Sequence, residues 1–507
     1  MNARHVVVVG AGPAGLSAAA AAAERGATVT LLDSADQLGG QYWRHLPAER
    51  AAEDEAVLHH GWQTFGQLQA TLATSPGVQI VRQAQVWSLE TAGTTTGSQN
   101  AAAVLHVLIG EVDSPDRRLL TLGPDALVLA TGAHDRTLPF PGWTLPGVFT
   151  AGAAQALAKG ERIAVGERVV VAGAGPFLLP VASSLSQAGA RVAAVIEAGT
   201  LRSLAAGWLS KPWQLVGAAH KSGELFGYLT HQLRGRIPYR TARAVIEAHG
   251  SDRVEAVTTA AVDHRWAPIP GTEEQIACDA VCVSHGFTPR LELAIAAGAA
   301  ISAERFVVVD ADQRTSVRAV FAAGEITGIG GVDAALVEGR IAGHVAAGGS
   351  HRDRELGTAH RDRLRTTAFA HRIEAAHGIR PGWTGWLRPD TIVCRCEETT
   401  LAAVHNAVAA TDSRSLRSTK LSTRAGLGIC QARICGRSVE TLLAETTDTT
   451  AAKFTPPPGS GSDGAGSDRR PIVTPIRLGE LAALTGDPVV IDPPPTSGPP
   501  TAAHAHP

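Results

Sequence analysis

The sequence has 507 residues, a length typical of about three domains, so it is not a single small binding module. Its net charge is −2 and charged residues make up 18% of the chain, a balance that excludes a basic surface for nucleic acid. The hydrophobic share of 44%, with 54 Gly, is typical of a cored α/β protein and excludes disorder throughout.

The first residues lead directly into an apolar strand, without the charged region and cleavage site of a secretory signal. No stretch reaches 18 uninterrupted apolar residues, so we predict no membrane-spanning segment. Six cysteines are too few for a disulfide scaffold at this length, and four of them lie within 42 residues near the C-terminus. We therefore expect a cytoplasmic protein.

The chain opens with a βαβ pattern. An apolar strand from Arg4 leads into a Gly-rich turn and an Ala-rich helix to about Arg25, and a second strand ends at Asp33. In such a turn the first glycine permits the tight bend, the second lets the backbone approach a pyrophosphate, and the third allows close helix–strand packing. The predicted dinucleotide contacts of this unit are Gly10, Gly12, Pro13, Ala14, Gly15 and Asp33.

Two later segments indicate which dinucleotide this unit holds. The segment from Asp125 to Gly132 is typical of a buried strand ending at a Gly turn, and the segment from Val320 to Glu325 repeats that pattern. Both resemble the closing motifs of the FAD domain in two-dinucleotide flavoproteins, where the second motif normally ends in Gly-Asp. A helix from Val332 would direct its positive end toward the flavin pyrimidine. The resemblance implies FAD contacts at Thr131, Gly132, Gly324, Glu325 and Gly331, and also at Gly40, Gln41 and Val86.

A second βαβ unit runs from Arg168 to Glu197, between the two FAD segments. Leu178 stands where a third Gly or Ala would let helix and strand close up. Glu197 favours a 2′-hydroxyl over a 2′-phosphate, while nearby Arg202 leaves the choice between NAD and NADP open. The unit could bind NAD(P), bind another adenine nucleotide without hydride transfer, or serve as an empty structural domain. Its predicted nucleotide contacts are Gly173, Gly175, Pro176 and Glu197.

Cys278 and Cys282 lie in one predicted strand, at a separation too large for a bridge, so we interpret both as packing residues. The sequence contains no Cys-x-x-Cys, which leaves a disulfide reductase mechanism without its residues. His285, at the end of the same strand, is interpreted as structural. With no Ser/His/Asp, paired-carboxylate or HExxH arrangement, we predict no catalytic side chain and expect cofactors to carry the chemistry.

A small cysteine-containing domain is predicted near the C-terminus. Cys394 and Cys396 form a C-x-C pair, and after 33 intervening residues Cys430 and Cys435 form a C-x₄-C pair. Four thiolates can hold tetrahedral zinc or an iron–sulfur cluster, and the ligands alone do not choose between them.

The residues around these pairs favour a redox centre. Gly426 and Gly428 can direct backbone N–H groups toward sulfur, and Arg424 and Arg433 can offset thiolate charge. The segment resembles the bacterioferritin-associated-ferredoxin-like [2Fe–2S] domain, which implies a [2Fe–2S] cluster held by the four cysteines. Zinc and free thiols remain alternatives.

These patterns predict an α/β fold in which a FAD domain is interrupted by a second Rossmann-like domain and followed by a small helical [2Fe–2S] domain. Within the Pro/Gly-rich tail, the apolar run from Ile476 to Leu484 could dock on a partner or pack on its own chain. The predicted boundaries are 1–158 for the first FAD part, 159–288 for the second nucleotide domain, 289–350 for the second FAD part, 351–388 for a linker helix, 389–447 for the [2Fe–2S] domain and 448–507 for a flexible tail.

The run from Ala130 to Val148 and the run from Gly173 to Val181 resemble the FAD-dependent α subunits of heteromeric bacterial dehydrogenases. That family includes the corresponding flavoprotein chains of opine oxidase, hydrogen cyanide synthase and D-hydroxyproline dehydrogenase. Leu178, in place of a third Gly or Ala, is part of the sequence pattern of that family. The resemblance implies an amine-oxidising β flavoprotein as partner, and a small ferredoxin-like subunit is a further candidate.

The resemblance implies an electron-transferring subunit, carrying FAD and [2Fe–2S], of a complex that oxidises the C–N bond of an amino acid, imino acid or opine. Two alternatives are weighed against this function. One is a stand-alone NAD(P)H-dependent flavin oxidoreductase that passes electrons to a ferredoxin or quinone. The other is a non-catalytic assembly subunit with zinc at the cysteines.

Overall fold

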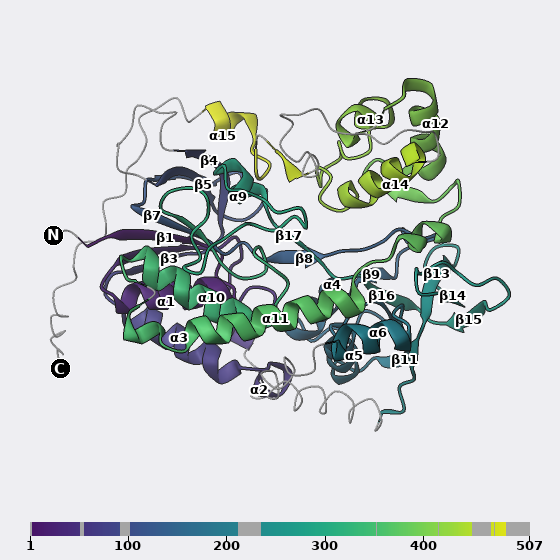
Figure 1. Ribbon diagram of the computed structural model, residues 1–507, viewed down its shortest axis with the longest axis horizontal. Helices are drawn as coiled ribbons and strands as arrows, with labels where there is room; N and C mark the ends of the chain where they lie inside the picture. The colour runs from purple at the N-terminus through teal and green to yellow at the C-terminus, as the bar shows by residue number, and fades with distance from the viewer. Residues whose placement is uncertain are drawn as a thin grey trace, which may run out of the picture.

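The computed structural model describes residues 3–50, 55–91, 102–210, 235–350, 352–413, 415–448, 468–470 and 472–482. Two parallel five-stranded sheets, each with helices on one face and a small antiparallel sheet on the other, form the body of the molecule (Figure 1). None of the helices in the described ranges combines the length and the apolarity that a membrane crossing requires.

The first sheet belongs to the predicted FAD domain and is built from both ends of the interrupted sequence. Its edge strand comes from the later segment and pairs with a strand of the earlier one, which closes the domain around the insertion. The strand order is β18 (Val320–Ala322), β7 (Ala126–Leu129), β1 (His5–Val9), β2 (Thr28–Leu32), β3 (Val78–Val81).

Two apolar cores lie on opposite faces of this sheet. On the first face the backbones of α1 and α10 approach closely, because a Cβ at Gly343 would lie 1.9 Å from the carbonyl oxygen of Ala18. The helices on the first face are α1 (Pro13–Glu24), α3 (Trp62–Thr74) and α10 (Gly331–Ala346). The elements on the second face are β4 (Ala84–Thr91), β5 (Ala103–Ile109), β6 (Arg118–Leu122) and α9 (Glu292–Ala296).

The second sheet forms the core of the second nucleotide domain, and its strand pairs are also parallel. The order is β12 (Tyr239–Thr241), β11 (Arg191–Glu197), β10 (Arg168–Gly173), β16 (Ala280–Ser284), β9 (Val148–Thr150). One face carries α4 (Ala151–Gly160) and α5 (Leu178–Gln187), and the other carries β13 (Arg243–His249), β14 (Ala256–Ala261) and β15 (Glu274–Ala277).

The boundary predicted between residues 158 and 159 is wrong. The strand β9 pairs with β16, and α4 packs on the second sheet, so both belong to the second domain. A three-residue strand gives too weak a periodic pattern to be assigned to a sheet from sequence. The domains are instead joined by an antiparallel ribbon of β8 (Ala133–Asp135) and β17 (Phe287–Pro289).

The linker helix α11 (Ala359–His377) runs along both domains (Figure 1). It packs against α10 of the FAD domain and against α6 (Leu201–Leu209) of the second domain. The contact with α6 is intimate, since a Cβ at Gly207 would lie 2.4 Å from the Cα of Ala376. The short elements near these helices are η1 (Ala48–Arg50), α2 (Glu55–Leu58) and η2 (Arg354–Leu356).

The cysteine domain follows and shares an apolar core with the second nucleotide domain. Leu138 and Trp266 of the body pack in the same core as Trp386 of the linker and Val404 and Leu443 of the cysteine domain. The elements are η3 (Pro381–Trp386), β19 (Ile392–Cys394), β20 (Thr399–Thr400), α12 (Leu401–Thr411), α13 (Leu416–Thr423) and α14 (Gly436–Asp448).

Part of the predicted flexible tail is docked on the body, which corrects the prediction for residues 468–470 and 472–482. The Val473 N–H donates to the carbonyl oxygen of Trp87 at 2.9 Å, and Glu480 accepts two hydrogen bonds from Arg117 at 2.7 Å. The short helix α15 (Leu478–Ala482) is held to the body by this ion pair of Glu480, while Leu478 remains 83% exposed. The rest of the tail lies outside the described residues.

Candidate functional site

A cavity of about 2800 Å³ extends along both nucleotide motifs. Its volume exceeds the range of roughly 300–1,000 Å³ common for small-ligand pockets, so one dinucleotide would not fill it. The predicted contacts that line it are Gly10, Gly12, Pro13, Ala14, Asp33, Gly40, Gln41, Val86, Thr131, Gly132, Gly175, Pro176, Gly324, Glu325 and Gly331. The predicted contacts that do not line it are Gly15, Gly173 and Glu197.

The first Gly-rich turn has the backbone that a pyrophosphate cradle requires. Gly10 has φ +104°, and a Cβ there would lie 2.3 Å from the carbonyl oxygen of Ala130. A Cβ at Gly15 would lie 1.6 Å from the carbonyl oxygen of Gly10, so Gly15 serves the close helix–strand packing rather than the cavity wall. A Cβ at Gly12 would lie 3.9 Å from the Cα of Gly40, an ordinary contact, and Gly12 lines the cavity at the start of α1. This cradle fits the pyrophosphate of FAD.

Asp33 ties the turn to the strand that follows it. Its carboxylate accepts hydrogen bonds from the N–H groups of Ala11 and Ala35, the latter at 2.7 Å. Burial raises the pKa of Asp33, and these two N–H groups together with Arg290 and Arg44 oppose that rise. Because Asp33 also lines the cavity, its carboxylate is open to a ribose hydroxyl.

The far end of the FAD site is organised by two glutamates. Glu325 accepts a hydrogen bond from the N–H of Gly331 at 2.9 Å, which places a carboxylate at the start of α10. Glu338 accepts from Gly324 at 2.9 Å and from Thr327 at 2.6 Å, and burial raises its pKa. Glu338 was not among the residues predicted from sequence, where its signal was an acid on the apolar side of the predicted helix.

The acid of the second nucleotide motif is closed off from the cavity. Glu197 is fully buried, and its carboxylate accepts from the N–H groups of Gly175 at 3.0 Å and Gly199 at 2.8 Å. The Tyr239 hydroxyl donates to the same carboxylate at 3.4 Å, and Nδ1 of His377 lies 3.3 Å from it.

His377 reaches this acid from the end of the linker helix α11. Its other ring nitrogen, Nε2, accepts a hydrogen bond from Nε1 of Trp208 at 3.3 Å. Trp208 belongs to α6, on which α11 packs. Sequence reasoning missed His377 because nothing local to the linker links it to the second nucleotide motif.

Leu178 changes the start of the helix that would hold a phosphate in the second site. In the FAD domain, α1 begins at Pro13, three positions after Gly10. In the second domain, α5 begins at Leu178, five positions after Gly173, and Leu178 is fully buried in the core below it. The first helical turn, whose N–H groups would bind a pyrophosphate, is therefore displaced along the chain.

The structure brings the four predicted cluster ligands together. The Cys435 thiol hydrogen bonds to both Cys394 and Cys430, which lowers the pKa of Cys394 to about 6 and that of Cys430 to about 5. The N–H of Gly426 lies 3.5 Å from Sγ of Cys394 and donates to it. Cys396 is the exposed member of the set.

The four thiols supply a complete donor set for a [2Fe–2S] cluster, which binds two sulfurs on each iron. Cys394 and Cys435 are buried, Cys430 is half-buried and Cys396 is exposed. The residues present therefore fit such a cluster.

The two arginines expected to offset thiolate charge bind carboxylates instead. Arg424 donates to Glu397 at 2.6 Å, and Nε of Arg433 donates to Glu292 of α9 at 2.7 Å. Arg433 also donates to the carbonyl oxygen of Cys430 at 3.2 Å. Arg433 thereby connects the loop between two cluster ligands to the FAD domain, a link that the sequence did not reveal.

The remaining cysteines and His285 are buried. Burial raises the pKa of Cys278 to about 12 and that of Cys282 further, so both are unreactive thiols. Burial, with a smaller contribution from Arg136, lowers the pKa of His285 to about 3, and its ring packs on Trp266 and Trp386.

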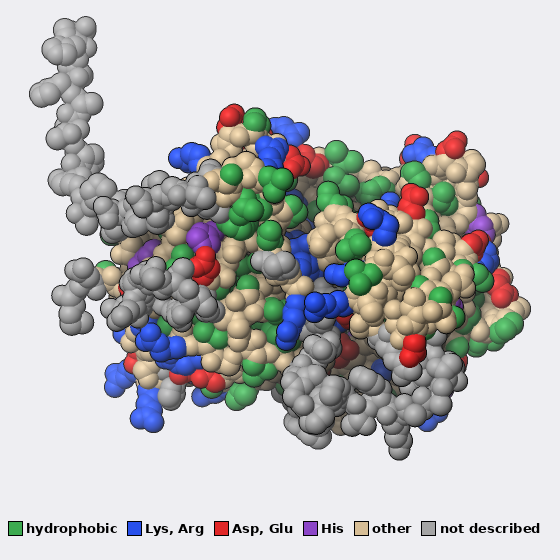
Figure 2. Space-filling model, turned by 90° about the horizontal axis from the view of Figure 1, so that it is seen from above, with side chains coloured by type: hydrophobic (Ala, Val, Ile, Leu, Met, Phe, Trp, Pro, Cys, Tyr) green, Lys and Arg blue, Asp and Glu red, His purple; other side chains and the backbone are tan. Residues whose placement is uncertain are grey.

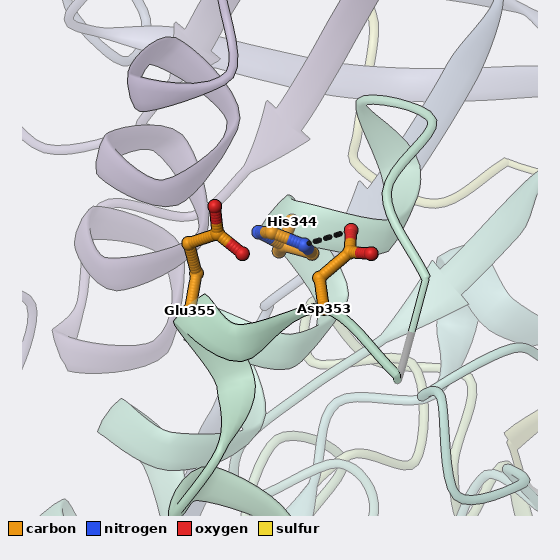
Figure 3. Close-up of side chains that lie close together, drawn as sticks. All are labelled: His344, Asp353 and Glu355. Atoms are coloured by element: carbon orange, nitrogen blue, oxygen red, sulfur yellow. Dashed lines mark hydrogen bonds and ion pairs between the residues drawn. The ribbon is translucent and has the colours of Figure 1, made fainter.

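A His–Asp–Glu group lies at the end of α10 (Figure 3). Asp353 accepts hydrogen bonds from the N–H of Ser350 and from Nε2 of His344, both at 2.9 Å, and these lower its pKa. Arg25 lies 3.4 Å from the same oxygen. Because these donors already satisfy the carboxylate, we interpret the group as a structural link between α10 and η2, with Glu355 exposed beside it.

Two family models match this chain. A family model described as pyridine nucleotide-disulphide oxidoreductase matches residues 4–348, and one described as BFD-like [2Fe-2S] binding domain matches residues 392–445. An opine oxidase subunit from Rhizobium meliloti is 31% identical over 94% of this chain and 87% of its own length. Hydrogen cyanide synthase subunit HcnB of Pseudomonas protegens is 31% identical over 85% of this chain and 89% of its own length.

Solved structures include one with a similar fold over most of the chain. L-proline dehydrogenase from P. horikoshii covers 94% of this chain and 79% of that chain, with a TM-score of 0.62 and 18% identity.

Proposed function

This chain belongs to the pyridine nucleotide-disulphide oxidoreductase family, together with its opine oxidase and HcnB relatives, and from that premise we propose that it is the electron-transferring subunit of a heteromeric dehydrogenase. The complex would oxidise the C–N bond of an amino acid, imino acid or opine. An amine-oxidising β flavoprotein would be its partner, a small ferredoxin-like subunit is a further candidate, and the complex would work in the cytoplasm.

The chain supplies binding sites rather than a catalytic side chain. FAD takes up two electrons and a [2Fe–2S] cluster carries one, so the pair can split a two-electron oxidation into single steps. The Gly10–Gly12 turn and Asp33 would hold the pyrophosphate and ribose of FAD. Cys394 and Cys430, the two thiols with lowered pKa, would bind iron as thiolates alongside Cys396 and Cys435.

The burial of Glu197 supports a partner, rather than NAD(P)H, as the source of electrons. A bound NAD ribose needs a free carboxylate at this position. Here Glu197 is fully buried and His377 and Tyr239 lie beside its oxygens. NAD(P)H would have to displace the end of α11 before it could bind in the usual way, which weighs against the stand-alone NAD(P)H-dependent reductase.

Anaerobic titration of the purified chain with NADH and NADPH tests this proposal. We expect the flavin absorbance to persist on the timescale of minutes, because the ribose acid is inaccessible. The complex purified with its associated chains should bleach when candidate amines or opines are added. Rapid bleaching of the isolated chain by NADH would overturn the proposal and favour the stand-alone reductase.

His377→Ala provides a matched variant for the same titration. If α11 closes the site, removing the imidazole should increase the affinity for NADH, measured by quenching of protein fluorescence. An equal affinity in the wild type and the variant would show that His377 is not the barrier.

A further inference from the structure

One face of α4 points into the flavin cavity from the second domain. Gly152, Gln155 and Lys159 line the cavity, and their spacing of three and four positions places them on the same side of the helix. The helix begins against Asp135, which accepts a hydrogen bond from the N–H of Gly152 at 2.9 Å. Asp135 follows Thr131 and Gly132 of the FAD motif by a few residues.

Lys159 is a buried ammonium group to which no described residue supplies a counter-ion. Its residue is 8% exposed, and its Nζ lies 5.6 Å from the centre of the Tyr42 ring. Among the residues that the structure describes, neither an ion pair nor a hydrogen bond joins this Nζ to an acceptor. The nearby carboxylate of Glu55 is paired with Arg162 at 2.8 Å and with His59 at 3.1 Å.

An anionic ligand would stabilise the buried ammonium group of Lys159. Burial lowers the pKa of Lys159 to about 8, the sign of an ammonium that lacks compensating charge. Such burial is costly unless an opposite charge lies close by, and Lys159 faces the cavity that the FAD would occupy. The ligand that fills the cavity therefore supplies the compensation.

Two parts of FAD can carry negative charge, the pyrophosphate and the reduced ring. The pyrophosphate has its own cradle at Gly12 and the start of α1, in the FAD domain. Lys159 comes from the second domain. It lies on α4, the helix whose first turn donates a hydrogen bond to Asp135. The ring gains a net negative charge when it takes up two electrons and one proton.

We propose that Lys159 stabilises the negative charge that bound flavin gains on reduction, and so raises the reduction potential of this FAD. The inference rests on FAD binding by this chain and not on the identity of the partner. Charge near the flavin ring is a general means by which proteins tune its potential. Lys159 is thus a positioning cation of the redox site rather than a catalytic residue.

The test is the midpoint potential of bound FAD in Lys159→Met, measured by equilibration with a reference dye during anaerobic reduction. We expect reduced flavin to be disfavoured at least tenfold, equivalent to a potential about 30 mV more negative for a two-electron couple. Lys159→Arg should keep the wild-type potential. Arg191→Met, which removes a positive charge at the exposed start of β11 and outside the cavity lining, should leave it unchanged.

Two results would overturn the proposal. One is an unchanged potential in Lys159→Met. The other is loss of FAD from oxidised Lys159→Met with normal thermal unfolding, which would assign the ammonium to the phosphates instead. Removing an unpaired buried charge should not unfold the apoprotein, and Lys159→Gln offers a second neutral variant for the same potential measurement. Failure of the proposed complex would leave this measurement unaffected, because it is made on the isolated chain.

Discussion

Two acids at equivalent positions in the two βαβ units have different environments. Asp33 lines the cavity, whereas Glu197 is fully buried and bound from several sides. The motif is the same in sequence, an acid at the end of the second strand. The two acids differ in the residues that surround them, because His377 of another element lies against Glu197. The identity of a residue therefore sets its chemistry, while its neighbours set its availability.

The glycines of the first turn predict a sharp contrast between two substitutions. Gly12→Leu should fold but lose FAD, because a Cβ there makes only an ordinary contact, 3.9 Å from the Cα of Gly40, and the longer side chain would compete for the space that we propose for the pyrophosphate. Gly15→Ala should lower stability, because its Cβ would meet the carbonyl oxygen of Gly10. FAD content and thermal unfolding of the two variants check this. A yellow Gly12→Leu protein would contradict the assignment of the site.

At the scale of elements, the docked part of the tail bridges two domains. Asp468 accepts hydrogen bonds from Nε and Nη2 of Arg305 at 2.9 and 2.6 Å, and Nη1 of Arg305 donates to Glu440 of α14 at 2.6 Å. Arg437 lies 3.8 Å from Asp468. Arg470 of the tail pairs with Glu292, the same acid that binds Arg433. Figure 2 shows the molecule from above, and Lys and Arg side chains gather near the middle of the face seen in that view.

This arrangement predicts that Asp468 contributes to stability. Asp468→Asn should lower the free energy of unfolding by about 2 kcal/mol, the order expected for hydrogen bonds to a partly buried charged group. The side chains of Arg305 and Asp468 are 14% and 12% exposed, so solvent screening is limited. Urea unfolding measures the change, with the exposed Asp252→Asn as control. Equal losses in both variants would show that the tail contact carries no special energy.

At the scale of the whole molecule, the cysteine domain is not an independent appendage. It shares a core with the second nucleotide domain and the linker, and α11 packs on both nucleotide domains. His285 lies in this junction, next to Trp266 and Trp386. The junction of the domains therefore contains an ionisable group that folding keeps neutral.

The lowered pKa of His285 predicts a loss of stability in acid. Its pKa is about 3 in the folded state, below the ordinary 6.5, so the unfolded state binds more protons between these values. The free energy of unfolding should fall as the pH drops below 6.5, by at most about 1.4 kcal/mol per pH unit for this group. His59, with a pKa of about 4, adds to the slope.

Urea unfolding at pH 7.5 and 5.5 checks this prediction, with His285→Phe as the matched variant. The variant removes one titrating group, so its free energy of unfolding should depend less on pH than that of the wild type. Parallel pH profiles for the two proteins would contradict the role given to His285.

Features encoded by residues adjacent in the sequence could be predicted. The FAD-type fold, the interrupted domain order and the [2Fe–2S] domain were predicted and are confirmed by the family matches and by the sheet topology. The Gly-rich turns could be predicted because a strand, a turn and a helix that are adjacent in sequence set their own backbone geometry. The cysteines were readable because their spacing and flanking glycines form local patterns.

The sequence by itself thus determined the kinds of motif that the chain carries: a dinucleotide turn, a second and imperfect one, and two cysteine pairs in a BFD-like domain. Tertiary structure alone decided that Glu197 is covered, that Lys159 faces the flavin cavity from the other domain, and that part of the tail is docked. Each of these depends on contacts between residues far apart along the chain. Such contacts follow from how whole helices and sheets bury their apolar faces, which no local pattern records.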